Sequence, residues 1–290
     1  MSARAAPHAI WRDRTLDVDG VPAHYLEAGE GEALVLIHGA LAWCCAELTY
    51  GAVIGPLSRS FHVIAVDVIG FGLTPGRGPQ DFAAQAQGDF LVEFLRRLGR
   101  PAHLAGNSHG GWLVQYVAHH APDLARRLVI INSLNGTSPV PTGYPLPRDT
   151  EAPPTLDGVG RYLRDFYLDE RVVTEERVRR THEMWTRNFD FARARRTALG
   201  STHAQWNTNL LYRGVHISEH AGRLGRPVLL TWSRENTGAS PADAAAFLQR
   251  LSDGELHVIT GAKHHVQTEH PERWTAAVTQ FLRSSRDELV

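Results

Sequence analysis

Six short, mainly apolar runs recur along the chain. They are ALVLIHG (33–39), FHVIAVD (61–67), AHLAGNS (102–108), RRLVIIN (126–132), PVLLTWS (227–233) and ELHVIT (255–260). Runs of this length that stay apolar at consecutive positions are typical of strands that are buried on both faces. The pattern therefore predicts six strands inside a sheet.

Segments with helical periodicity lie between these runs, at 82–99, 112–122, 242–251 and 271–285. Alternation of strands and helices implies an α/β fold, with a mostly parallel central sheet flanked by helices on both faces. Ahead of the series, TLDVDG (15–20) and VPAHYLEAG (21–29) have the pattern of a hairpin that leads into the sheet.

Residues 137–216 interrupt the alternation with a Pro-rich stretch followed by amphipathic helical segments. We therefore expect a core formed by 1–136 and 217–290 and an inserted helical cap over 137–216. The insert is rich in aromatic residues: Tyr162, Phe166, Tyr167, Trp185, Phe189 and Phe191. Two interpretations stay open, since these rings can dock the cap on the core or roof an apolar pocket.

Composition narrows the class of protein. The 290 residues are 43% hydrophobic and 21% charged with a net charge of −1, so the chain lacks the basic balance of a nucleic-acid-binding protein. Its two cysteines, Cys44 and Cys45, are adjacent and offer no disulfide framework. The sequence contains neither a signal-peptide pattern nor an apolar stretch of 18 residues, and we expect a cytoplasmic protein with no membrane partner.

The strongest chemical motif is Gly106-Asn107-Ser108-His109-Gly110, which matches G-x-S-x-G. It ends one apolar run and precedes a helical segment, and this is the strand–turn–helix context in which the motif presents a nucleophilic serine. A serine hydroxyl needs a base within hydrogen-bond reach to act at neutral pH. Ser108 is therefore the candidate nucleophile.

His264 is the candidate base because it follows the last predicted strand. We expect a ring nitrogen of His264 within about 3.5 Å of Ser108 Oγ. The chain has 16 histidines, and the adjacent His265 and nearby His270 are the alternatives. No zinc signature such as H-E-x-x-H is present, and we expect neither a metal nor a cofactor.

An acyl-transfer reaction also needs backbone N–H groups that stabilise the developing oxyanion. One is expected from His109, the residue after the nucleophile. The second is expected from Ala40, in the loop that follows His38-Gly39; a simple strand-ending turn is the alternative interpretation of that dipeptide.

The segments LIHGALAW, AVDVIGFGLT, GNSHGGWL, PVLLTWSREN and GAKHHVQTEHPERW together resemble the α/β-hydrolase superfamily. Within it, the chain is most similar to meta-cleavage-product hydrolases, which split carbon–carbon bonds in ring-fission products of aromatic degradation. The resemblance implies an α/β-hydrolase fold. It also directs attention to a substrate pocket formed by His38, Gly39, Asn107, Trp43, Trp112 and His265.

The resemblance places a catalytic acid after the strand PVLLTWS, where this chain has Ser233-Arg234-Glu235-Asn236. The acid position therefore holds Asn236. An amide oxygen can set the tautomer of the histidine but cannot offset the charge of an imidazolium; in serine proteases the same change costs about 10⁴ in kcat, about 5 kcal/mol. Glu235 is the alternative partner, and we predict that Asn236 faces His264.

Two other positions depart from the family. The arginine that holds a substrate carboxylate in the family aligns near Thr181, with Arg180 adjacent, and the tryptophan that follows the catalytic histidine is His265 here. Dienone diacids are therefore doubtful substrates for this chain.

Three functional hypotheses follow. The leading one is a serine hydrolase of an ester, lactone or activated carbon–carbon bond in a hydrophobic small molecule. The second keeps the fold but uses His264 alone as a base, in a lyase, cyclase or cofactor-free oxygenase. The third is a ligand-binding pseudo-enzyme. The sequence leaves open whether the chain forms a homodimer.

Overall fold

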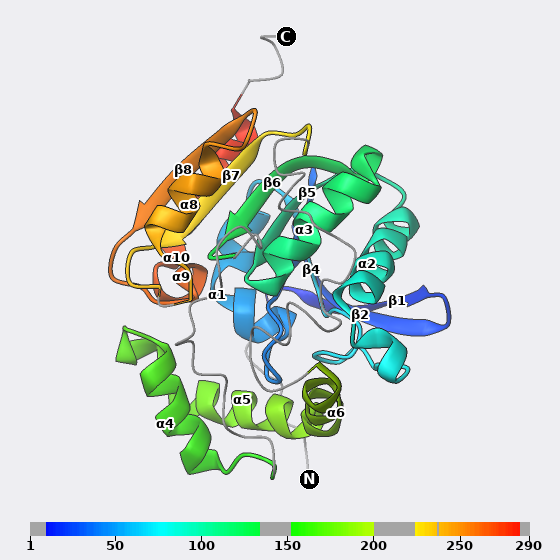
Figure 1. Ribbon diagram of the computed structural model, residues 1–290, viewed down its shortest axis with the longest axis vertical. Helices are drawn as coiled ribbons and strands as arrows, with labels where there is room; N and C mark the ends of the chain where they lie inside the picture. Colours follow the sequence, from blue (N-terminus) through cyan, green and yellow to red (C-terminus); the bar gives the residue numbers. More distant parts are fainter. Residues whose placement is uncertain (1–9, 134–151, 200–223, 237, 285–290) are drawn as a thin grey trace.

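The computed structural model describes residues 10–133, 152–199, 224–236 and 238–284, and an eight-stranded sheet lies at its centre (Figure 1). The order is β1-β2-β4-β3-β5-β6-β7-β8. The pairs β1–β2 and β2–β4 are antiparallel, and all other neighbours are parallel, which confirms the predicted mostly parallel sheet. The strands are β1 (Arg12–Val18), β2 (Val21–Ala28), β3 (Ala33–Ile37), β4 (His62–Val66), β5 (Ala102–Asn107), β6 (Ala125–Ile131), β7 (Val228–Ser233) and β8 (Gly254–Ile259).

The N-terminal hairpin is present, but its first strand begins earlier than predicted. Asp19 and Gly20 have φ values of 51° and 79°, the backbone of a type I′ turn, which joins strands that pair directly on either side. These two residues therefore form the turn, whereas the predicted range 15–20 had placed them in the strand.

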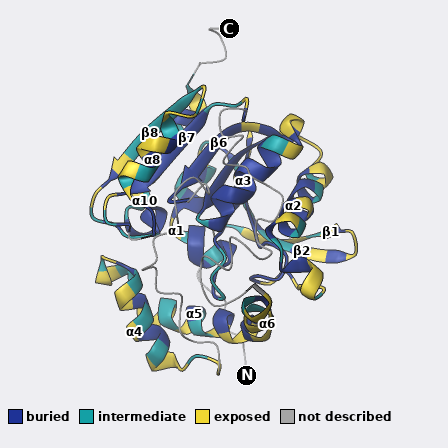
Figure 2. Ribbon diagram, in the orientation of Figure 1, coloured by how far each residue is buried: buried dark blue, intermediate teal, exposed yellow. Residues whose placement is uncertain are grey.

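Helices cover both faces of the sheet (Figure 1). On β3, Val35 and Ile37 pack in one core with α2 and α3, whereas Leu34 and Leu36 pack in a second core with α1 and α10. Each central strand is thus buried on both sides, as Figure 2 shows, and this explains its continuous apolar pattern. The helices around the sheet are α1 (Ala46–Ser58), α2 (Ala84–Leu98), α3 (His109–His120), α8 (Pro241–Leu248), α9 (Val266–Glu269) and α10 (Pro271–Arg283). Single 3-10 turns are η1 (Pro79–Asp81), η2 (Pro122–Leu124) and η3 (Glu170–Val172).

Two helices differ from the sequence prediction. The pattern does not predict α1, because most of its residues are buried and it lacks a continuous polar face, and because Pro56 lies inside it. Helix α3 begins at His109, earlier than the predicted start at residue 112, so that the helix follows the candidate nucleophile directly.

The described part of the insert is helical, with α4 (Leu156–Phe166), α5 (Glu175–Arg187) and α6 (Phe189–Leu199). Figure 1 shows these helices together at the end of the sheet where the parallel strands terminate. Residues of α4 and α5, including Leu163 and Trp185, pack with Trp43 and Leu48 of the core. Both expected borders of the insert, at 136/137 and 216/217, lie outside the described residues.

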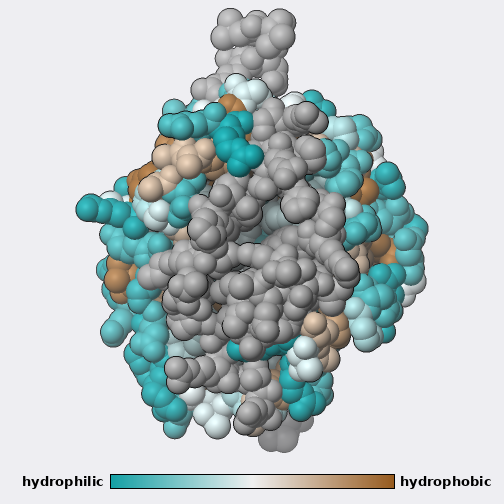
Figure 3. Space-filling view, in the orientation of Figure 1, coloured by the Kyte–Doolittle hydropathy of each residue, from teal (hydrophilic) through white to brown (hydrophobic). Residues whose placement is uncertain are grey.

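The described surface is mainly polar on the face seen in Figure 3, with small separate apolar areas. Within the described ranges, no helix is both long enough and apolar enough to cross a membrane.

Candidate active site

Ser108 occupies a sharp turn between β5 and α3. Its φ of 54° and ψ of −120° lie outside the regions that residues with side chains normally adopt, so the backbone here is strained. The flanking glycines of the motif permit this turn because neighbouring backbone segments approach so closely that there is no room for a Cβ. A Cβ on Gly106 would lie 2.1 Å from the carbonyl oxygen of Gly110, and a Cβ on Gly110 would lie 2.1 Å from that of Ile37.

Hydrogen bonds hold the strained turn in place. The N–H of Ser108 donates to the carbonyl of Ile131 at 2.9 Å, and the carbonyl of Ser108 accepts from the Ser133 hydroxyl at 2.6 Å and from the N–H of Gly111 at 2.9 Å. The Ser108 side chain is thereby presented at the carboxyl end of β5, where ligands bind in open α/β sheets.

The loop that carries His264 is fixed beside this turn by two amide side chains. Asn107 Nδ2 donates to the carbonyl of His264 at 3.2 Å, and Asn132 Nδ2 donates to the same carbonyl at 3.0 Å. Asn132 also accepts from the N–H of Ser233 at 2.8 Å, which ties β6 to β7. Sequence reasoning assigned Asn107 to the pocket and gave no role to Asn132, yet both position the backbone of the candidate base.

Asn236, and not Glu235, contacts the ring of His264. Asn236 Oδ1 lies 3.0 Å from His264 Nδ1, while Asn236 Nδ2 donates to the carbonyl of Ala239 at 2.9 Å. The second bond fixes the amide orientation, so Oδ1 accepts and the proton of a neutral His264 resides on Nδ1. Glu235 Oε2 instead accepts from the N–H of Gly261 at 2.9 Å.

This environment keeps His264 neutral. Burial lowers the pKa of His264 to about 4, and the amide of Asn236 that contacts Nδ1 carries no charge to offset this effect. Nε2 of this tautomer carries a lone pair and can accept a proton at physiological pH.

The expected contact between Ser108 Oγ and a ring nitrogen of His264 stays a prediction. The hydrogen bonds described above for Ser108 are made by its backbone. Such contacts are often long in unliganded sites and shorten when substrate binds.

The candidate oxyanion donors belong to two segments, the start of α3 and the loop after β3. His109 is the first residue of α3, where helix N–H groups have no acceptor within the helix. The loop after β3 is oriented by His38, which is 1% exposed: its Nε2 accepts from the N–H of Val68 at 3.0 Å, and its Nδ1 donates to the carbonyl of Gly39 at 2.6 Å. Because that carbonyl and the N–H of Ala40 belong to one trans peptide, they point in opposite directions.

The residues expected to line the pocket separate into two groups. Gly39 lies against Ser108, where an added Cβ would be 3.4 Å from that of the serine. Trp43 and His265 pack together with Phe166 of the cap, with ring centroids 5.5 Å apart for Trp43–His265 and 4.9 Å for Phe166–His265. Trp112 is placed differently: it stacks on His109 and belongs to the core formed with α2 and α3.

Cap residues come close to the candidate base itself. The ring of Phe166, the last residue of α4, lies 6.1 Å from that of His264, and Tyr162 stacks on Phe166 at 5.6 Å. Of the two interpretations of the insert's aromatics, docking is evident for Trp185, which is buried in one cluster with Trp43 and Leu48 of the core.

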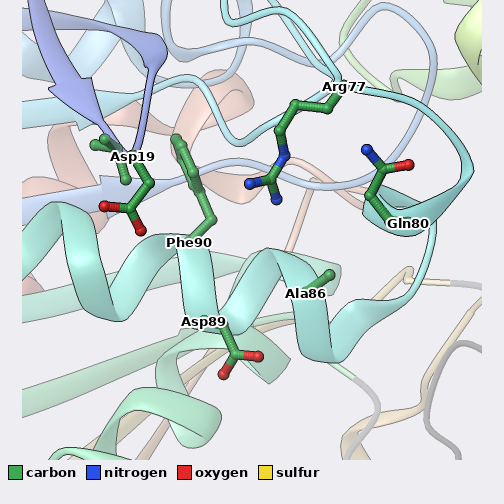
Figure 4. Close-up of a pocket in the computed structure, with 7 residues that line it drawn as sticks. Asp19, Arg77, Gln80, Ala86, Asp89 and Phe90 are labelled. Atoms are coloured by element: carbon green, nitrogen blue, oxygen red, sulfur yellow. The ribbon is translucent and has the colours of Figure 1, made fainter.

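A separate cavity of about 250 Å³ lies at the hairpin and α2 (Figure 4). It contains none of the expected site residues; its lining residues are Val18, Asp19, Arg77, Gln80, Ala86, Asp89 and Phe90. Arg77 is engaged there by the buried Asp81. Among the described side chains, no three of the His, Cys, Asp and Glu type cluster as metal ligands would.

Comparison with known proteins places this arrangement in a family. The sequence model of the alpha/beta hydrolase family matches residues 34–278. This chain belongs to that family. The predicted superfamily and fold are therefore confirmed.

Its relatives include hydrolases of dienedioates and trienedioates, and similar solved structures include a meta-cleavage product hydrolase. The 2-hydroxy-6-oxononadienedioate/2-hydroxy-6-oxononatrienedioate hydrolase of Comamonas testosteroni is 25% identical over 272 residues, covering 89% of this chain and 90% of that protein. The enzyme of the same name from Burkholderia vietnamiensis is 28% identical over 271 residues, covering 90% of each. The structure of a meta-cleavage product hydrolase from Pseudomonas fluorescens superposes with a TM-score of 0.81 at 23% identity, covering 94% of this chain and 98% of that one.

Proposed function

We propose that this protein is a serine-dependent hydrolase that acts on an ester, a lactone or an activated carbon–carbon bond of a hydrophobic small molecule. The observation that carries the proposal is the attachment of the His264 backbone to Asn107, the residue that directly precedes Ser108. Nucleophile and base are thereby held at one edge of the sheet although they are far apart in the sequence.

In acyl transfer, Ser108 Oγ attacks the substrate carbonyl while Nε2 of His264 takes its proton. The N–H groups of His109 and Ala40 stabilise the oxyanion, and the protonated His264 then protonates the leaving group. The reaction requires Ser108 Oγ to lie within hydrogen-bond reach of Nε2 when substrate is bound. For carbon–carbon cleavage, His264 first moves a proton on the substrate so that the leaving carbon can depart as a stabilised anion.

The substrate is proposed to be largely apolar near the cap. The ring of Phe166 lies next to His264, and the rings of Trp43 and Tyr162 pack on Phe166. The names of the two relatives from Comamonas testosteroni and Burkholderia vietnamiensis describe dioates, whose carboxylates need a cationic partner. Arg180 is already bound to Glu47 and Glu183, so it does not offer an unpaired charge to a substrate carboxylate.

The pairing of His264 with Asn236 weakens the case for acyl transfer and favours a second function. With Asn236 as its partner, His264 lacks the negative charge that stabilises an imidazolium, and a reaction that uses a neutral histidine as its only base needs no such charge. A lyase, cyclase or cofactor-free oxygenase would fit this description.

A panel of p-nitrophenyl esters and dienone ring-fission products tests the proposal, with wild type and Ser108→Ala compared on each compound. The hydrolase proposal expects turnover by wild type and a loss of at least 10³-fold in the variant. Turnover that survives Ser108→Ala but is lost in His264→Ala would instead support the histidine-only function.

A further inference from the structure

Glu269 is a buried carboxylate that bonds both to the loop that carries His264 and to the cap. It lies in α9, is 5% exposed, and follows the candidate base by one short helix. Oε1 accepts from the N–H of Lys263 at 2.8 Å. Oε2 accepts from the N–H groups of Leu168 and Asp169, at 2.6 and 3.0 Å.

These bonds make the carboxylate a shared acceptor. Lys263 directly precedes His264 in the catalytic loop, whereas Leu168 and Asp169 lie just beyond Tyr167, the residue that caps the end of α4 in the cap. A buried carboxylate is costly unless its oxygens are hydrogen-bonded, and here three backbone N–H groups meet that need. Neither segment can move away without leaving one carboxylate oxygen unsatisfied.

A second bond links the same two segments. Lys263 Nζ donates to the carbonyl of Asp165, in the last turn of α4, at 2.6 Å. The ring of the next residue, Phe166, lies against His264 and His265. The end of α4 therefore contacts the catalytic loop through backbone, side-chain and aromatic interactions at once.

We propose that Glu269 is a positioning residue that couples the end of cap helix α4 to the loop carrying His264, so that displacement of either segment displaces the other. Its catalytic consequence rests on the proposed function: movement of the cap on substrate binding would be transmitted to the imidazole. A misplacement of about 1 Å at a reacting group can lower the rate about 10²-fold.

Glu269→Gln tests this coupling, because a glutamine has a single acceptor oxygen and cannot serve Lys263 and the cap together. The matched control is Glu47→Gln, which removes the ion pair between α1 and Arg180 of α5, a cap–core contact away from His264. Amide hydrogen exchange is compared between wild type and both variants. Steady-state kinetics use p-nitrophenyl acetate, which is small, and p-nitrophenyl octanoate, which is bulky.

The proposal expects Glu269→Gln to increase exchange both in 163–172 and in 262–266 and to lower kcat for both esters about tenfold. Glu47→Gln should increase exchange in α1 and α5 and change kcat less than twofold. Faster exchange in 163–172 alone, with a raised KM for the octanoate and unchanged kcat for the acetate, would overturn it, since Glu269 would then merely anchor the cap.

Lys263→Met provides a second variant if Glu269→Gln does not fold. It removes the bond from Nζ to Asp165 and leaves the three bonds of Glu269 in place, so the proposal expects the two segments to remain coupled, with faster exchange in 163–172 accompanied by faster exchange in 262–266; faster exchange in 163–172 alone would contradict it. The exchange measurements do not require turnover, so an inactive wild type would refute the proposed function while leaving the coupling open to its own test.

Discussion

Asn236 Oδ1 lies 3.0 Å from Nδ1 of His264, at the position where the resemblance to α/β hydrolases expects a carboxylate. Because Asn236 Nδ2 is bound to the carbonyl of Ala239, the amide oxygen is the atom that faces the imidazole. The candidate base thus has a partner that sets its tautomer and orientation but carries no negative charge.

Restoring the carboxylate with Asn236→Asp should raise kcat for acyl transfer by about 10- to 10³-fold, because the aspartate stabilises the imidazolium that forms. It should also raise the pKa of His264, which burial now lowers to about 4, and so move the acid limb of the kcat/KM profile to higher pH. Steady-state kinetics from pH 3.5 to 8 measure both effects.

Glu235→Gln is the control for that experiment, since its carboxylate bonds to the N–H of Gly261 and not to the histidine. Its effect on kcat should be small. A loss of activity in Glu235→Gln with unchanged folding would mean that Glu235 supports His264 during turnover, and unchanged or reduced activity in Asn236→Asp would favour the histidine-only chemistry.

The stability of the protein should decrease as the pH falls below about 6.5. Burial lowers the pKa of each of five histidines: His38, His103, His109, His264 and His265. In the unfolded chain these groups take up protons near pH 6.5, so the unfolded state binds more protons and is favoured by acid. Each contributes up to about 1.4 kcal/mol per pH unit over this window. His24 opposes the trend, because although burial disfavours its charge, the hydrogen bond and charge of Asp67 raise its pKa.

Urea unfolding at pH 7.5 and pH 5.5 measures this dependence. His103, buried away from the candidate site beside Phe61, offers a specific check. In His103→Asn the difference between the two pH values should become smaller. Equal stability of the wild type at both pH values would contradict the assignment of these histidines as neutral in the folded state.

Asn132 should contribute both to stability and to activity. Its side chain bonds to the backbone of Ser233 and of His264, and its φ is 44°. Asn132→Ala should lower the free energy of unfolding by roughly 2–4 kcal/mol, from lost hydrogen bonds and from the cost of this φ for alanine.

Asn132→Gly separates the two causes, because glycine adopts a positive φ without penalty but makes no side-chain hydrogen bond. Chemical denaturation should find the glycine variant more stable than the alanine variant, with both reduced in kcat to a similar degree. Full activity in Asn132→Gly would show that the amide does not position His264.

The sequence allows the sheet and the sharp turn at Ser108 to be predicted because their signals are local. Strands buried on both faces are recognisable from consecutive apolar residues, and the glycines around Ser108 are required by close backbone contacts. The partner of His264 could also be predicted, since its spacing from the end of β7 fixes which of two adjacent residues reaches the ring.

Other features leave no local signal. Helix α1 is buried on most sides and has no amphipathic pattern. Asn132 and Glu269 act through hydrogen bonds to the backbone of residues about a hundred positions away, and such bonds do not depend on the identity of the residue that they hold. Trp112 follows the nucleophile closely in sequence, but the turn of α3 directs it into the core.

Covalent labelling with a fluorophosphonate, followed by mass spectrometry of the peptide that contains Ser108, tests the central claim most directly. A serine reacts only when a base activates it, so wild type should be labelled at Ser108 while His264→Ala should be labelled at least 100-fold more slowly. Equal absence of label in both proteins, with the fold intact, would contradict the assignment of Ser108 and His264 as nucleophile and base.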